Sequence, residues 1–133
     1  MRDNEVNDSL NNLSSEKLEL FLKHFLKEHG FSSVAIIARN SGKEITAIAF
    51  IEIGIISYQF FIKFVVGNTI ISATMLNKLR SEANAKTNKG LIITTSTFTR
   101  EAKSAKRKKG EILIDLIDGS QLTKRVKELN LSV

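Results

Sequence analysis

The sequence predicts an α/β fold with a mixed central sheet flanked by helices, in the order α-β-β-β-α-β-α-β-α. Apolar residues first recur at helical spacing, at Leu18, Phe21, Leu22, Phe25 and Leu26. Three strand-like apolar runs then follow with short breaks, and helix and strand patterns alternate after them. This succession predicts an antiparallel meander joined to β-α-β units.

The first half of the chain supplies one helix and three strands. The helix should run from about Ser15 to His29, between a serine cap and Gly30. The strand-like runs extend from Ser33 to Arg39, from Glu44 to Ile53 and from Ile56 to Val66. Turns between them fall at Asn40-Ser41-Gly42 and at Gly54, which favours antiparallel pairing of all three strands.

The second half alternates helices with strands. The expected elements are a helix capped by Ser72, a strand from Leu91 to Thr95, a helix starting at Ser96 or Thr99 and ending at Gly110, a strand from Ile112 to Ile117, and a closing helix after Asp118-Gly119. The short apolar run at Leu91 is typical of a central strand that is covered on both faces.

Length and composition limit the number of domains and the expected location of the protein. A chain of 133 residues, 42% hydrophobic and 26% charged, suffices for one compact core. Residues 1–12 are polar and predict a disordered tail, which leaves residues 13–133 as a single domain. Without cysteine there is neither a disulfide nor a thiolate metal site, so the cytoplasm is the expected location. The longest apolar stretch, Ile45 to Val66, contains charged residues and predicts buried strands rather than a membrane span.

The net charge of +6 is concentrated after Ser32, and its densest part predicts a nucleic-acid contact. That part consists of Lys103, Lys106, Arg107, Lys108 and Lys109, on the helix expected to end at Gly110. A solvated helix face near a C-terminus would explain the same run. Phosphate could also dock beside Thr95, Ser96, Thr99 and Arg100, where a strand leads into a helix N-terminus, although capping alone accounts for the hydroxyls.

The second half of the chain also resembles a known family. The residues that carry this resemblance are Lys89-Gly90-Leu91-Ile92-Ile93-Thr94-Thr95-Ser96, Phe98-Thr99, Ala102, Ala105, and Leu116-Ile117-Asp118-Gly119 with Leu122. In this order and spacing they resemble the Mrr-type restriction endonuclease catalytic domain. The resemblance implies the restriction-endonuclease-like PD-(D/E)xK core and magnesium-dependent hydrolysis of DNA.

The active site that this resemblance implies is incomplete here. The family pattern needs a carboxylate on the second strand, a Glu or Gln on the third, and a Lys two residues later. Thr46 stands at the first position, Phe61 at the second, and Lys63 alone survives. Because a hydroxyl is a poor magnesium anchor and a phenyl ring is none, we expect no metal and no cofactor.

Two other carboxylates could substitute for the missing ones. Glu44 and Glu52 match Thr46 in parity along the strand, which is compatible with a shared face. Glu52 lies among apolar residues, where it could act in catalysis, pair with Lys63 in a structural salt bridge, or lie in water at a strand end.

Three functions remain open at this stage. The first is a degenerate nuclease-like module that binds nucleic acid, in the first place DNA, or regulates a protein partner. The second is an active magnesium-dependent endonuclease that uses Lys63 with a relocated carboxylate. The third is a structural subunit, and a homodimer is compatible with each of them.

Overall fold

The computed structural model describes residues 3–40 and 43–132. Its elements in chain order are α1 (Asp3–Asn11), α2 (Ser15–Glu28), β1 (Ser33–Asn40), β2 (Glu44–Ile53), β3 (Ile56–Val65), α3 (Ala73–Glu82), β4 (Lys89–Thr94), α4 (Arg100–Ala105), β5 (Ile114–Ile117) and α5 (Gly119–Leu129). The turn expected at Asn40-Ser41-Gly42 lies partly outside the described residues.

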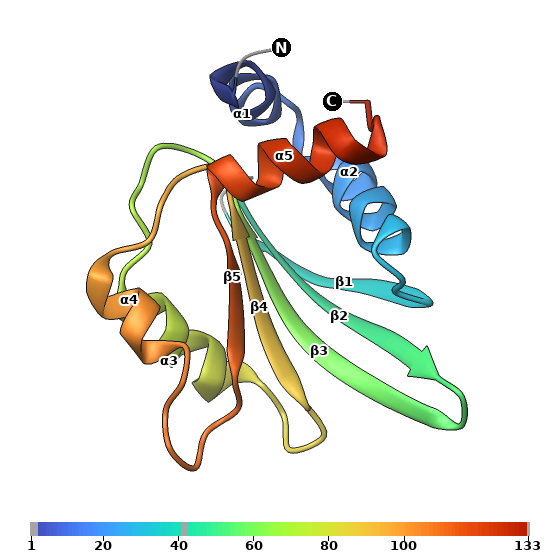
Figure 1. Cartoon of the computed structure of the whole chain (residues 1–133), viewed down its shortest axis with the longest axis vertical. Helices are drawn as coiled ribbons and strands as arrows, with labels where there is room; N and C mark the ends of the chain where they lie inside the picture. The colour runs from blue at the N-terminus through green and yellow to red at the C-terminus, as the bar shows by residue number, and fades with distance from the viewer. Residues whose placement is uncertain (1–2, 41–42, 133) are drawn as a thin grey trace.

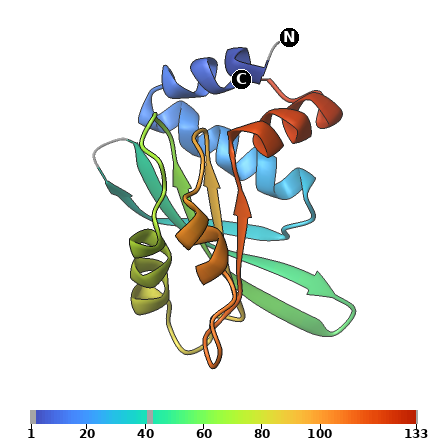
Figure 2. The ribbon, with the colours of Figure 1, turned by 60° about the vertical axis from the view of Figure 1, so that its left-hand side comes forward.

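The strands form one sheet in the order β1-β2-β3-β4-β5. The pairs β1–β2 and β2–β3 are antiparallel, and β3–β4 and β4–β5 are parallel. Helices α1, α2 and α5 lie over one face, and α3 and α4 cover the other (Figures 1 and 2). The predicted mixed sheet with flanking helices is therefore confirmed.

Strand alternation divides the core between the two faces. On β2, Ala47 and Ala49 pack into the cluster beneath α2 and α5, whereas Ile48 packs with the cluster beneath α3 and α4. Gly90 lets α3 approach β4 closely, because a Cβ there would lie 2.9 Å from Leu79 Cδ2 and 3.0 Å from Ile114 Cγ1. Within the described residues no helix combines the length and apolar character needed to cross a bilayer.

The N-terminal segment differs from the prediction. Residues 3–11, predicted to belong to a disordered tail, form α1, and its Val6 and Leu10 are fully buried. The Asn11 side-chain oxygen accepts hydrogen bonds from Gly67 N at 3.0 Å and from Thr95 Oγ1 at 2.8 Å. A polar segment thus docks through two apolar residues and specific amide contacts. Met1 and Arg2 lie outside the described residues.

The helix that was expected to carry the basic run is also shorter than predicted. Helix α4 ends at Ala105, so only Lys103 of that run is helical and Lys106 is the C-cap. The chain then turns, with Glu111 N donating to Lys108 O at 3.0 Å, and Gly110 adopts a φ of +79°. Residues 106–111 therefore form a loop that leads into β5.

Candidate functional site

Lys63 occupies the centre of the face covered by α3. The hairpin register places it directly opposite Thr46, and its ammonium donates to Thr46 Oγ1 at 3.0 Å. The Lys63 side chain is only 1% exposed. A buried ammonium is costly unless anions and acceptors surround it, so the surroundings of Lys63 determine what this site can do.

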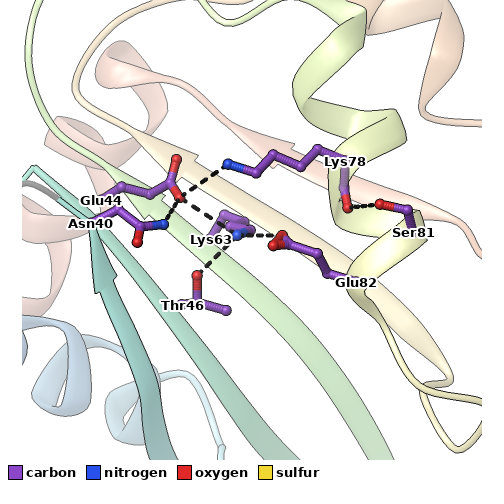
Figure 3. Close-up of polar contacts among 7 residues, drawn as sticks. All are labelled: Asn40, Glu44, Thr46, Lys63, Lys78, Ser81 and Glu82. Carbon is purple, nitrogen blue, oxygen red and sulfur yellow. Dashed lines mark hydrogen bonds and ion pairs between the residues drawn. The ribbon is translucent and has the colours of Figure 1, made fainter.

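Two carboxylates reach the Lys63 ammonium from different elements (Figure 3). Glu82, at the end of α3, places Oε1 2.6 Å from Lys63 Nζ. Glu44, at the start of β2, places Oε2 3.5 Å from the same nitrogen. We refer to Thr46, Lys63, Glu44, Glu82 and Lys78 as the Lys63 cluster.

The charges of the Lys63 cluster balance. Lys78 Nζ lies 4.0 Å from Glu44 Oε2, so two ammonium groups face two carboxylates. Glu44 Oε2 also accepts a hydrogen bond of 2.8 Å from Asn40 Nδ2. The carboxylate oxygens that face the buried lysine are thus already engaged by cations and an amide.

A divalent cation does not fit this arrangement. Magnesium prefers several anionic or carbonyl oxygens, whereas the space between Glu44 and Glu82 holds the ammonium of Lys63. In residues 3–40 and 43–132 no group of three or more acidic or histidine side chains could hold a metal ion. A dication would enter a cluster that is already neutral, so we derive no step through a metal.

The other residues that the family pattern singles out lie as follows. Phe61 is buried on the same face as Lys63, with its ring centroid 5.8 Å from the ammonium, where it provides an apolar wall with cation–π attraction. Glu52 is exposed opposite Ser57, near the hairpin end. At about 3.3 Å per residue it lies about 20 Å along the strand from Thr46. The expected alternative of a Glu52–Lys63 pair is therefore wrong.

Glu82 was not singled out from the sequence. Its position three residues after the buried Leu79 places it near the sheet-facing side of α3. This spacing, together with Lys63 on a strand expected to be covered, was the only sequence feature that could have pointed to Glu82. The signal does not give the rotation and offset of α3 over the sheet, which decide that Glu82 meets Lys63.

The predicted nucleic-acid residues fall into an exposed set and an engaged set. We call Lys103, Lys106, Arg107, Lys108 and Lys109 the basic segment, and all five are exposed. Arg80 of α3 holds the loop in place: its Nη2 donates to Ile112 O at 3.0 Å and to Lys106 O at 3.1 Å. Arg80 therefore ties the two ends of the loop that carries Arg107, Lys108 and Lys109 to α3.

The phosphate site expected around Thr95 is largely closed. Thr95 is only 8% exposed, and its hydroxyl is bonded to Asn11 and Gly67, which contradicts its role as an open anion site. Thr99 caps α4 by accepting from Ala102 N at 3.0 Å, and Ser96 O accepts from Gly119 N at 2.8 Å. Of this group only Arg100 is exposed, and it lies at the start of α4.

The mixed sheet with helices on both faces is the fold of restriction endonucleases. It matches the DNA modification-dependent restriction endonuclease AspBHI with a TM-score of 0.67 and 14% identity, over 94% of this chain and 36% of that chain. It also matches the MspJI restriction endonuclease in complex with a 27-mer oligonucleotide, with a TM-score of 0.63 and 14% identity, over 96% of this chain and 30% of that chain. The chain thus spans about a third of the length of each.

The family follows from the sequence itself. The restriction endonuclease family model of the Mrr catalytic domain matches residues 10–126, and the chain belongs to this family. No curated protein matches the chain. The predicted Mrr-type resemblance is confirmed.

Proposed function

We propose that this chain is a restriction-endonuclease-like module that binds nucleic acid, in the first place DNA, without hydrolysing it. One observation carries the proposal: the ammonium of Lys63 is engaged by the carboxylates of Glu44 and Glu82, which would otherwise be free to bind a metal ion. The site keeps the lysine of the family pattern and uses it as a structural cation.

The charge balance explains why hydrolysis is not expected. Metal-assisted phosphodiester cleavage requires a cation that polarises the phosphate and lowers the pKa of the attacking water. Here Thr46 offers a hydroxyl and Phe61 a ring, while both carboxylates neutralise lysines. A lysine that is 1% exposed and held by a carboxylate at 2.6 Å has no access to a water beside a bound phosphate.

The basic segment supports binding. Its five exposed cations belong to a chain of net charge +6, and Arg80 fixes the loop that carries most of them. Because the ends of the loop are already held, its cations can gain phosphate contacts with a smaller entropy loss on binding. The likeness to a restriction endonuclease structure that contains an oligonucleotide is compatible with this role.

Cleavage assays test the loss of hydrolysis. The protein is incubated with supercoiled plasmid and with single-stranded DNA, in magnesium and separately in manganese, and the products are resolved on gels. We expect both substrates to remain intact. Metal-dependent cleavage that disappears in Lys63→Met, with the variant still folded by circular dichroism, would show that the active-nuclease alternative is right.

Binding assays with charge reversal test the interface. Arg107→Glu/Lys108→Glu should weaken DNA binding on the order of tenfold and reduce the slope of log K against log salt by about two. The matched control is Lys17→Glu/Lys27→Glu, which changes the net charge equally at two exposed lysines of α2. Equal losses in both variants, or no binding at all, would instead favour a structural subunit.

A further inference from the structure

A cavity of about 380 Å³ opens on the sheet face opposite the Lys63 cluster. It lies among α2, α5 and strands β2 to β5, and its apolar lining includes Phe25, Phe31 and Phe60. The rings of Phe31 and Phe60 meet edge to face with centroids 5.1 Å apart. We call this the aromatic cavity. Its volume falls in the range of about 300–1,000 Å³ that small-molecule sites occupy.

Positive charge dominates the polar side chains that line the aromatic cavity. Asp115 is compensated, because Lys89 Nζ lies 2.7 Å from its Oδ2. Lys106 and Arg125 also line the cavity, and neither forms an ion pair with any described residue. His29 Nδ1 lies 2.7 Å from Phe25 O, which fixes the ring and leaves Nε2 available. The cavity therefore combines an aromatic wall with two uncommitted cations.

Lys106 connects the aromatic cavity to the basic segment. It follows α4, which covers the other face of the sheet, and it also lines the cavity, so it lies beside the edge strand β5, where the two faces meet. Because Lys106 directly precedes Arg107, a phosphodiester chain held by Arg107 and Lys108 would pass close to Lys106. A base attached to that chain could then leave the solvent and enter the cavity.

We propose that the aromatic cavity holds the base of an unpaired nucleotide, with the attached phosphate contacted by Lys106 and Arg125. This inference rests on the proposed nucleic-acid binding and specifies its substrate as a strand with an unpaired base. Stacking against phenylalanine accepts every base, since each has a π face. The cations select for the phosphate that every nucleotide carries.

Titration with a mononucleotide tests the cavity without relying on strand binding. The probes are dAMP, deoxyadenosine and inorganic phosphate, and the readout is the NMR shift of the Phe31 and Phe60 ring resonances. We expect dAMP to move both rings at the lowest concentration. Arg125→Ala should weaken dAMP binding about tenfold, as loss of a charge-assisted contact predicts. Lys124→Ala, at an exposed neighbour that does not line the cavity, should leave the affinity unchanged.

Oligonucleotides separate this inference from the proposed function. A single strand and a duplex with one extruded nucleotide should bind more tightly than a fully paired duplex, and Arg125→Ala should remove that preference. Arg107→Glu/Lys108→Glu should weaken all three. Charge reversal could weaken binding while no ring resonance moves and Arg125→Ala leaves the affinities for all three oligonucleotides unchanged. In that case the cavity inference fails and the proposed function stands. Movement of the rings by dAMP without any strand binding would instead contradict the proposed function and limit the cavity to free nucleotides.

A protein segment is the competing occupant. The β2–β3 hairpin ends in the exposed residues Ile53, Ile55 and Ile56, which a second copy could insert into the cavity. Sedimentation at increasing concentration, alongside the NMR titration, distinguishes the two. If the ring resonances shift as the protein dimerises and added dAMP does not change them, the occupant is a second copy. Loss of these shifts in Ile55→Glu would then overturn the nucleotide proposal.

Discussion

The ammonium of Lys63 and the carboxylate of Glu82 lie 2.6 Å apart, at the meeting point of β3 and the helix that follows it. The lysine is 1% exposed, whereas the carboxylate is 39% exposed. The pair therefore connects a buried cation to the surface. Lys63 needs this contact more than Glu82 does, because Glu82 is also hydrated. On the function proposed above, the same contact that stabilises Lys63 keeps both groups from taking part in metal chemistry.

Glu82→Gln should destabilise the fold by roughly 1–3 kcal/mol, because it leaves a buried ammonium with a weaker partner. The loss should stay below the roughly 3–5 kcal/mol of a fully broken buried pair, since Glu44 and Thr46 still contact Lys63. Urea denaturation measures the free energy of unfolding. Glu111→Gln, at an exposed carboxylate, is the control, and equal effects in the two variants would refute the role given to Glu82.

Removal of the ammonium should create a metal site that the wild type lacks. In Lys63→Met, which keeps similar volume, Glu44 and Glu82 lose their shared counter-ion and become able to share manganese. Millimolar manganese should then raise the melting temperature of Lys63→Met. At a hundred times the dissociation constant, the gain in free energy of unfolding would be about 2.7 kcal/mol. The wild type should not respond. A wild-type increase as large as that of the variant would show that the lysine does not block the site.

Arg80→Met should loosen the loop that carries the basic segment. The carbonyls of Lys106 and Ile112 lose their guanidinium donor, so hydrogen exchange across residues 106–112 should accelerate. DNA affinity should fall about fivefold, about 1 kcal/mol, because the loop must be ordered on binding. Lys86→Met removes the same charge at an exposed site and is the control. If both variants lose equal affinity, charge rather than order explains the effect.

Gly119→Ala should destabilise the fold by about 2 kcal/mol or more. A Cβ at this position would lie 2.4 Å from the backbone oxygen of Thr95 and 2.7 Å from Asn7 Nδ2, so the start of α5 must shift away from the backbone that follows β4. Ser120→Ala, one residue later and exposed, should change stability by less than about 0.5 kcal/mol. Thermal unfolding of both variants checks this, and a neutral Gly119→Ala would mean that α5 does not pack closely against the Thr95 backbone.

The strands could be predicted well because their signal is local. The expected run from Glu44 to Ile53 coincides with β2, and the Gly54 turn fixes the register that places Thr46 opposite Lys63. Parity along the strand correctly grouped Glu44 with Thr46. Glu52 shares this parity but lies in water near the hairpin end, one of the alternatives considered for it, because parity gives the face of a strand and not the distance along it.

The helices that complete the site and the core were less predictable. Glu82 reaches Lys63 through the placement of α3 over the sheet, which no local pattern specifies. Helix α1 was missed because only Val6 and Leu10 supply its apolar contact. Its polar contacts include the side-chain amides of Asn7 and Asn11, whose partners Gly119 and Thr95 lie far along the chain. The pattern of residues 1–12 alone gives no indication of those partners.

That attachment has a consequence for the order in which the molecule assembles during translation. The partners of α1 at Thr95 and Gly119 leave the ribosome long after α1 itself. Closing so large a loop costs entropy that is offset only when both ends are structured. We therefore expect α1 to dock only after β4 and α5 have formed.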